Sequence, residues 1–547
     1  MKSHVTRRAG GLRIRLLGCL VAVVVVAGVS PSSTALAPAA GRVPERAAPD
    51  ESALGFVVQL GPEQRVAGPT DQGDNPYFSE KREGKLYGYF GTSRTLEWRS
   101  HNNTRLTNSR IILDRGLPGE FDECGAWLQG SFQRLTRQHW IAFYHAEGQG
   151  PGDDTCDHYA NTTVWRMAMA ETTNGGLTWQ RPSYPNNVVV TGTGASMTGG
   201  ITNAGNGRTV RVGDYYYMFF ETNHGTRPGL PGIHIARSKV SDGGARGTWK
   251  KYYCTTPASG DPVCAWSQPG IGGKSTPIGG LSEKGRYIAW NSRLSRWLGF
   301  DASGRRGFQM FASEVGTGDT ALERQQSALF DEAGLPKRWV GSEDVYPLVS
   351  TDADPYVDQW GGHLRDAKSK QLYAYPSISG AEGQSCCTGG TFYVYYVKLF
   401  PGDKFTDRYL FRRKVTVTRT DRALNRVELT TYKNGKGQRR SSTEAPKPRT
   451  FKAVGAAGYL LSHAGVTGWK QVMDCTRKAD HALFAGKCKS GWKPYRRIGF
   501  VRPTKTKLAN VALYRCVAKR SHYVSASRSC DGGQREARIG FAMRELS

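Results

Sequence analysis

The feature that most constrains the fold of this sequence is a pattern that recurs five times between residues 85 and 400. Each copy has an aromatic strand, a loop, an alternating strand and a tight turn, and the clearest copy runs from Trp140 to Trp179. Alternation of apolar and polar residues is typical of strands with one buried face. First strands begin near 85, 139, 214, 286 and 371. Five such units predict an all-β chain built on a five-bladed β-propeller, with a large β-sandwich as the alternative.

The copy from Trp140 to Trp179 closes with a distinctive turn, TTNGGLTW over 172–179. This stretch nearly fits the Asp-box pattern Ser-x-Asp-x-Gly-x-x-Trp, with Thr172 and Asn174 in place of Ser and Asp. Polar side chains in such a turn bond its backbone, and Gly176 supplies the backbone freedom that the turn needs. The pattern predicts a structural turn of a propeller blade, and it carries little information about chemistry.

The N-terminus has the organisation of a secretory signal. Lys2, Arg7, Arg8, Arg13 and Arg15 precede a 14-residue apolar run, which is too short to span a bilayer well, and small residues follow. We therefore expect residues 1–39 to be a signal peptide and residues 40–54 a flexible mature N-terminus. The mature protein is expected to be secreted and extracellular, with no membrane contact after signal cleavage.

Cysteine usage agrees with export. Eleven cysteines are present, and ten remain once Cys19 is removed with the signal. An even count in an exported chain favours disulfides. Short spacings favour three local pairs, and a vicinal bridge between Cys386 and Cys387 with Cys124–Cys156 as the fifth pair is one option among several for the rest. The three local pairs are Cys254–Cys264, Cys475–Cys488 and Cys516–Cys530.

The net charge of +29 is concentrated at the C-terminus, where residues 411–547 hold 31 Lys and Arg against 8 Asp and Glu. The same region contains a repeat of 41 residues, in which the Gly-Phe and Gly-Tyr pairs ending at Tyr459, Phe500 and Phe541 align. Three repeats predict a pseudo-threefold, trefoil-like β domain. The expected boundaries are a propeller over 55–405, a linker over 406–418 and a basic three-repeat domain over 419–547.

Candidate functional residues lie at strand ends facing the propeller's channel, because ligands bind where the innermost strands converge. Carboxylates there are candidates for acid and base work, and Trp side chains can stack on sugar faces. Each also has a structural interpretation, in a turn, a core or a solvated loop. The catalytic candidates are Asp74, Glu147, Asp122 and Glu123, and the substrate-binding candidates are His145, Trp127, Glu221, Asn291 and His363.

Three stretches carry a resemblance: Asp74-Asn-Pro, Phe143-Tyr-His-Ala-Glu147 and Ile235-Ala-Arg-Ser238. With the five units, they resemble five-bladed propeller glycosidases of the arabinanase and fructosidase type over about 55–405. The resemblance implies glycoside hydrolysis with Asp74 as base or nucleophile and Glu147 as general acid. The chain departs from the family where Asn75 separates Asp74 from Pro76, where Asn203 opens blade three without an acid, and where no Glu opens blade four. Either the site is rebuilt on Glu147 with Asp122 or Glu123, or the propeller only binds.

The C-terminal part, through Asp480-His481, Leu513-Tyr-Arg-Cys516 and Ser521-His-Tyr-Val-Ser525, resembles a repeat domain of unknown function appended to exported bacterial hydrolases. Its charge predicts attachment to an anionic cell-wall or extracellular glycan, while export argues against nucleic acid. We therefore expect an exported glycoside hydrolase acting on a polysaccharide, most simply a furanoside of the arabinan type. A sialidase-like hydrolase and a non-catalytic carbohydrate-binding propeller are the alternatives. No cofactor is expected, apart from an optional structural Ca²⁺ at the propeller centre or a metal at His363.

Overall fold

The computed structural model describes residues 56–545 with gaps at 71, 102–104, 131, 150–155, 157–162, 194–202, 223–231, 256–261, 282–286, 303–307, 340–352, 355–363, 367–370, 385, 405, 420–425, 447–449 and 463–467. The expected signal peptide, the segment 40–54 and the candidate His363 therefore lie outside the described residues. The described chain is almost entirely β, and the α-helix α1 (Ala321–Leu329) begins at the N-cap Thr320. No helix in the described ranges is long and apolar enough to cross a membrane.

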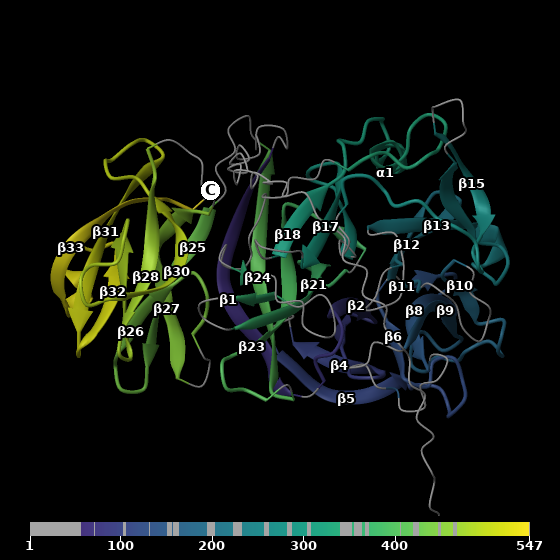
Figure 1. Ribbon diagram of the computed structural model, residues 1–547, viewed down its shortest axis with the longest axis horizontal. Helices are drawn as coiled ribbons and strands as arrows, with labels where there is room; N and C mark the ends of the chain where they lie inside the picture. Colours follow the sequence, from purple (N-terminus) through teal and green to yellow (C-terminus); the bar gives the residue numbers. More distant parts are fainter. Residues whose placement is uncertain are drawn as a thin grey trace, which may run out of the picture. The chain divides into compact units, whose positions relative to one another are not determined.

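Four separate sheets follow one another along the chain in a propeller-like arrangement of blades (Figure 1). The first contains β2 (Phe78–Arg82), β3 (Lys85–Tyr89), β4 (Thr95–His101) and β5 (Arg105–Leu113). The second contains β6 (Gly125–Leu128), β7 (Gln133–Arg134), β8 (Trp140–Gly148), β9 (Val164–Thr172) and β10 (Val188–Val190). The third contains β11 (Gly205–Val212), β12 (Tyr215–Glu221), β13 (Ile233–Lys239), β14 (Lys250–Thr255) and β15 (Val263–Pro269). The fourth contains β16 (Tyr287–Asn291), β17 (Arg296–Ala302), β18 (Phe308–Ala312) and β22 (Cys387–Thr388).

Strand β8 shows why the blades stack. Its alternating side chains divide between two cores, because successive residues of a strand point to opposite faces. Trp140 and Tyr144 pack in the core shared with the first sheet. Ile141 and Phe143 pack in the core shared with the third sheet. The aromatic strand predicted from the sequence is therefore buried on both faces, between two neighbouring blades.

The turn after β9 has the hydrogen bonds that its sequence predicts. The Thr172 hydroxyl accepts from Gly176 N at 3.1 Å, and the Asn174 side-chain oxygen accepts from Thr178 N at 3.0 Å. Trp179 is buried and stacks on Phe132 with ring centroids 4.9 Å apart. The turn thus closes the blade with its own side chains.

A fifth group of strands lies in a sheet of fifteen, in the order β19 (Ala353–Asp354), β20 (Leu364–Asp366), β21 (Leu372–Gly380), β23 (Thr391–Leu399), β24 (Arg408–Arg419) and β1 (Phe56–Thr70). The first described strand, β1, pairs antiparallel with β24 along its length. The expected linker over 406–418 is therefore wrong, since most of it is a twelve-residue strand. Its basic residues suggested a boundary, but Arg413 is buried and donates to the Tyr396 hydroxyl at 3.2 Å.

The C-terminal strands repeat one pairing scheme three times, in which the first strand of each unit pairs with both of the others. Gly458, Gly499 and Gly540 occupy equivalent bulges with φ of 146°, 145° and 159°. The units are β25 (Arg426–Asn434), β26 (Arg439–Ser442) and β27 (Phe451–Leu461), then β28 (Lys470–Arg477), β29 (Asp480–Ala485) and β30 (Lys493–Val501), then β31 (Ala509–Ala518), β32 (Ser521–Ser525) and β33 (Gln534–Met543).

The disulfides confirm the local pairs predicted from spacing. Three bridges join cysteines 10 to 14 residues apart, as expected when a strand and its neighbouring turn bring two side chains together, whereas Cys124–Cys156 spans 32 residues. Of the cysteines in the described chain, Cys386 and Cys387 are outside any disulfide. The bridges are Cys124–Cys156, Cys254–Cys264, Cys475–Cys488 and Cys516–Cys530.

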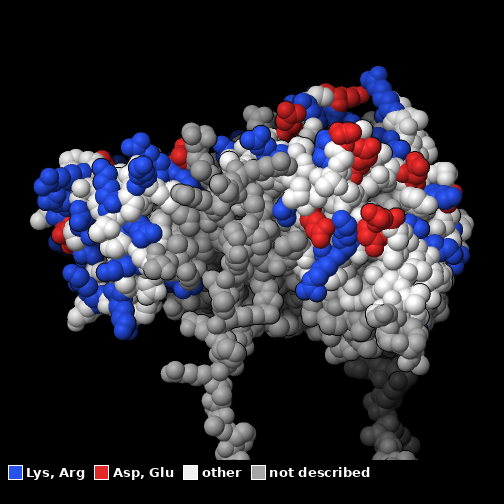
Figure 2. All heavy atoms as spheres, turned by 90° about the horizontal axis from the view of Figure 1, so that it is seen from above, with Lys and Arg blue, Asp and Glu red and all other residues white. Residues whose placement is uncertain are grey.

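The surface of the three C-terminal units is strongly basic. Within the described residues of 426–545, seventeen Lys and Arg residues are exposed, against three Asp and Glu. Figure 2 shows these cationic side chains at the left of the view, with few acidic ones among them. The charge asymmetry of the sequence is therefore presented on the outside of these units.

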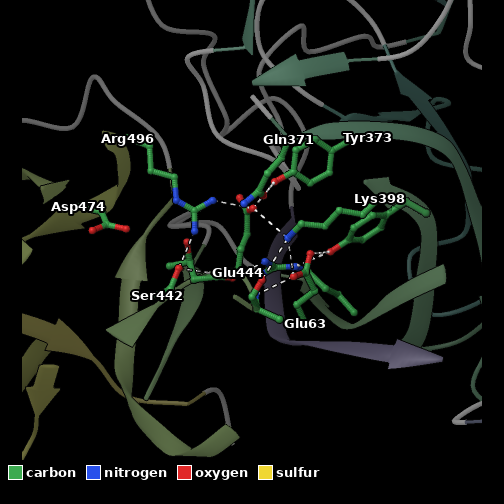
Figure 3. Close-up of polar contacts among 12 residues, drawn as sticks. Glu63, Gln371, Tyr373, Lys398, Ser442, Glu444, Asp474 and Arg496 are labelled. Atoms are coloured by element: carbon green, nitrogen blue, oxygen red, sulfur yellow. Dashed lines mark hydrogen bonds and ion pairs between the residues drawn. The ribbon is translucent and has the colours of Figure 1, made fainter. Parts of the chain in front are cut away.

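A buried ionic network joins β1 and β23 to the first two C-terminal units (Figure 3). Lys398 Nζ lies 3.0 Å from Glu63 Oε2 and 3.6 Å from Glu444 Oε2, and Arg496 Nη1 lies 2.6 Å from the same Glu444 oxygen. The Tyr373 hydroxyl also donates to Glu444. Burial opposes the ionised form of Glu444, but Arg496 and Lys398 outweigh it and hold the pKa of Glu444 well below its usual value.

Candidate active site

The end of β8 carries a buried imidazole and carboxylate in contact. His145 Nε2 lies 2.8 Å from Glu147 Oε1, and the two residues are 3% and 8% exposed. The His145 ring stacks on Trp127 at 5.3 Å between centroids and meets Trp165 edge-on at 5.1 Å. Its Nδ1 accepts from Asn206 N at 3.1 Å. Strands of two blades thus hold one imidazole on all sides.

These contacts fix the proton on the ring. Because His145 Nδ1 accepts a backbone N–H, the proton of the neutral imidazole must lie on Nε2, from which it is donated to Glu147. Two glycines make room for the arrangement. A Cβ on Gly205 would lie 2.7 Å from the His145 ring, and one on Gly125 would lie 2.0 Å from the Trp127 ring. The pair is therefore built by close backbone approach on both sides.

Trp127 was predicted to stack on a sugar, but its side chain is not open to solvent. Its side chain is 3% exposed and covers the imidazole face, so it positions His145.

Cys124 N donates to Glu147 O at 3.0 Å, but the side chains of Asp122 and Glu123 bond to partners other than Glu147. Asp122 Oδ2 accepts from Tyr144 Oη at 2.8 Å and Arg181 Nε at 2.7 Å. Tyr144 lies on the face of β8 opposite His145 and Glu147, so Asp122 belongs to the core shared with the first blade. Burial raises the pKa of Asp122, against the lowering effect of Arg181. Glu123 accepts from the backbone N–H of Gly119 at 2.6 Å and holds its own turn.

Asp74 is held at the start of the first blade by the large sheet. Its Oδ1 accepts from Tyr375 Oη at 3.0 Å, and Arg408 Nη2 lies 3.3 Å away. The neighbouring Asn75 side chain accepts from Gly91 N at 2.7 Å, so the residue that interrupts the expected Asp-Pro pair fixes the loop.

Asp74 and Glu147 lie at the same end of their blades. Arg82, the last residue of β2, donates to Gly176 O, and the Gly176 turn follows Thr172, which pairs with Trp140 at the start of β8. The far end of β2 therefore lies beside the start of β8. The opposite end of β2, which Asp74 precedes, must then lie toward the end of β8.

Glu221 lies at this end as well. It pairs with Gly205 across β12 and β11, and Gly205 packs against His145. Glu221 is 3% exposed.

Asn291 shapes a turn instead of facing the site. It donates to Thr388 Oγ1 at 3.0 Å and to Gly389 O at 2.8 Å, and accepts from Leu294 N at 2.9 Å. These bonds hold the turn after β16 and attach it to the β22 segment.

A second polar cluster lies nearer the propeller axis and was not anticipated from the sequence. Glu80 of β2 pairs with Arg134 of β7 at 2.6 Å. Arg208 of β11 interacts electrostatically with Glu80 and with Tyr287 of β16. These residues come from four different blades, so the cluster marks where the blades converge. Burial raises the pKa of Glu80 to about 7, against the lowering effect of Arg134 and Arg208.

The two clusters adjoin along β11, where Arg208 lies two residues beyond Asn206, whose N–H is donated to His145. Arg134 pairs with Trp140 at the start of β8, whereas Glu147 is near the end of the same strand. Seven residues of strand at about 3.3 Å each place Trp140 about 23 Å from Glu147, so the Arg134 side of the second cluster is distant from Glu147. In the sequence, Glu80 and Arg208 are isolated charged residues within predicted inner strands. No motif links the two, so their contact could not be predicted.

Among the described residues, no group of three or more His, Cys, Asp or Glu side chains is placed to hold a metal ion. His363 and the optional Ca²⁺ stay predictions, since His363 lies outside the described residues.

No protein-family model matches this chain, and no curated protein matches it in sequence. Solved structures similar to it include an α-L-arabinofuranosidase from Lactobacillus brevis, at 13% identity and a TM-score of 0.36, covering 70% of this chain and 97% of that one. A family 117 glycoside hydrolase from Zobellia galactanivorans gives 7% identity and a TM-score of 0.36, covering 66% and 91%. An endo-1,4-β-xylanase from Bacteroides thetaiotaomicron has 11% identity and a TM-score of 0.34, and the match covers 65% of this chain and 100% of that one. Identities and TM-scores this low assign no activity, so function must be argued from this chain's own residues.

Proposed function

We propose that this protein is an exported glycoside hydrolase acting on a polysaccharide, with furanosides of the arabinan type as the first substrates to test. The observation that carries the proposal is the buried His145–Glu147 pair, whose proton position is fixed by Asn206. It lies at the same blade end as Asp74 and Glu221. Glycoside hydrolysis needs carboxyl groups in different protonation states, and a set of carboxyl groups in different surroundings at one end of a propeller can supply them.

The contacts favour particular roles. A proton donated by His145 stabilises the ionised form of Glu147, so Glu147 suits the base or nucleophile better than the general acid expected from sequence. Asp74 also has a cationic neighbour, since Arg408 Nη2 lies 3.3 Å from its Oδ1. Glu221 is the third carboxyl group at this end and is 3% exposed, and we assign it the proton-donor role.

Substitution of each carboxyl group tests these roles on the full-length protein. Glu147→Gln should lower kcat/KM on arabinan about 10²- to 10⁴-fold, the usual contribution of an acid or base. Glu221→Gln should lower activity on arabinan by a similar factor but spare aryl glycosides, whose leaving groups need no protonation. Glu171→Gln is the matched control, because Glu171 also pairs with a histidine, His139 at 3.2 Å, at the opposite end of the same blade. Activity unchanged in Glu147→Gln would reject the site.

Burial of the pair favours a second candidate, a non-catalytic carbohydrate-binding propeller. His145, Glu147 and Trp127 are each less than one-tenth exposed. Binding of arabinan by wild type and Glu147→Gln alike, with no release of reducing ends by either, would favour this second function.

The five-bladed ring belongs to the same proposal. Residues of β21 and β23, such as Tyr373 and Ile378, share one core with Phe308 of the fourth sheet. Other residues of β21 and β23 share a second core with Tyr77 and Phe90 beside the first sheet. Both contacts support these strands, with β24 and β1, as the fifth blade. The repeated pairing of the C-terminal units supports a trefoil-like domain in the same way.

The basic C-terminal surface supports an attachment role toward an anionic glycan. Its exposed cations outnumber the exposed acids by seventeen to three in the described residues. Full-length protein should therefore bind a uronate polymer more tightly than neutral arabinan, and the difference should fall as salt screens the charges. Equal, salt-independent binding to both polymers would contradict the attachment role.

A further inference from the structure

Two adjacent thiols lie beside the axial cluster. Cys386 and Cys387 are the cysteines of the described chain outside a disulfide, and Cys386 is exposed. Their segment is attached to the fourth blade, since Trp290 N donates to Cys386 O at 3.1 Å and Trp290 pairs with Cys387 across β16 and β22. The backbone that carries the two sulfurs is therefore fixed on both sides of the peptide bond that joins them.

The surroundings of the two sulfurs are charged. The side chains of Cys386 and Cys387 are hydrogen-bonded to each other, and both interact with Arg208 and Glu80. The hydrogen bond from Cys386, together with the Arg208 guanidinium and against burial, lowers the pKa of the Cys387 thiol. The bond to Cys387 raises the pKa of Cys386. One sulfur is thus prepared as a nucleophile, and its neighbour keeps its proton.

We propose that Cys386 and Cys387 form a redox-active vicinal dithiol at the propeller axis, which closes to a disulfide ring by exchange with an external disulfide. The Cys387 thiolate attacks one sulfur of that disulfide, forming a mixed disulfide and releasing one external thiolate. Cys386 then loses its proton and attacks the Cys387 sulfur, forming the ring and releasing the second thiolate. The external disulfide is reduced to two thiols, and the protein loses two hydrogen atoms.

Ring closure changes the charge around Arg208. A thiolate next to the guanidinium is replaced by a neutral sulfur, so Arg208 loses one negative neighbour while Glu80 stays close. The proposal is independent of the glycosidase assignment, because the chemistry is measured on sulfur.

The test uses the full-length protein with its other disulfides intact. After gentle reduction, the protein is incubated with oxidised glutathione, quenched with iodoacetamide and mapped by peptide mass spectrometry. We expect the wild-type peptide containing both cysteines to be lighter by two hydrogens, unalkylated and free of glutathione. Cys386→Ser should retain glutathione on Cys387, because no resolving thiol is left. Cys387→Ser should acquire it severalfold more slowly on Cys386.

Arg208 provides the matched pair of controls. Arg208→Gln should slow alkylation of Cys387 severalfold, whereas Arg208→Lys, which keeps the charge, should slow it less; circular dichroism checks that both variants fold. Two results would overturn the proposal. One is a wild-type peptide alkylated on both sulfurs after the exchange, and the other is equal rates of glutathione uptake by the two single-serine variants.

Discussion

Replacing Lys398 by methionine is the sharpest test of the buried network in Figure 3. Methionine retains much of the side-chain volume and removes only the ammonium group. Lys398, Glu63 and Glu444 have side chains that are 0%, 0% and 5% exposed. The variant therefore keeps the packing but leaves the two carboxylates without the cation that lies between them.

The expected cost follows from burial. Removing one partner of a buried ion pair typically costs about 3–5 kcal/mol, because the remaining charge stays desolvated. Arg496 still pairs with Glu444 at 2.6 Å, whereas Glu63 keeps the Ala445 N–H at 2.7 Å and the Tyr396 hydroxyl. Glu63 loses its ion pair but still interacts electrostatically with buried Arg413. We therefore expect a decrease of about 3 kcal/mol in the free energy of unfolding, at the lower end of that range.

Urea unfolding followed by tryptophan fluorescence measures the change. Lys337→Met is the control, because Lys337 pairs with Glu314 at 3.1 Å with side chains 29% and 50% exposed. An exposed pair is worth about 0–1 kcal/mol. The double variant Glu63→Gln with Lys398→Met should recover part of the loss, since it removes the stranded charge. Equal destabilisation by Lys398→Met and Lys337→Met would refute the reasoning.

Three further predictions concern other parts of the chain. Burial lowers the pKa of His522, but its 2.6 Å bond to Asp480 and the charges of Asp480 and Glu536 together outweigh burial and raise that pKa. The stabilisation is therefore complete below about pH 6.5 and is lost as pH rises through the higher folded value. His522→Asn should therefore reduce the melting temperature at pH 5.5 more than at pH 9. The depressed pKa of Glu444 has the opposite effect, because its stabilisation is present above about pH 4.3 and is lost as pH falls through the folded value. Glu444→Gln should therefore make the stability of the protein depend less on pH in the acid range. Gly205→Ala should cost about 1–3 kcal/mol and lower any activity on arabinan, because its methyl group would displace the His145 ring.

Local patterns in the sequence were sufficient to predict much of the fold. The alternation in β8 predicted a strand, the Thr172–Trp179 residues predicted the turn after β9, and close spacing predicted three of the four disulfides. Burial of charge was not predictable in the same way. Arg413 looked like part of a basic boundary, yet it is buried beside Tyr396 in β24, because a guanidinium with fixed partners can be accommodated inside a protein.

In the candidate site, too, contacts within one strand were predictable and contacts between distant segments were not. His145 and Glu147 are two residues apart in one strand, so their common face follows from the two-residue period. Asp122 was grouped with Glu147 because both precede or follow strands of the second blade, but the side of a blade on which a loop residue points depends on its partners, here Tyr144 and Arg181. Glu80 meets Arg208 only when separate blades converge, and no local pattern encodes that approach.

The pairing of β1 decides how the basic C-terminal units can be studied. Besides its long antiparallel contact with β24, β1 pairs in parallel with β25 through Gln59 and Leu60. Leu60 and Leu429 share one apolar core with strands of the fifth group and of the C-terminal units. Cutting the chain before β25 would therefore expose a strand edge and part of that core, which favours aggregation. Glycan attachment is better tested by charge-reversing substitutions on the exposed face of the full-length protein, where the propeller's last strands keep the basic units folded.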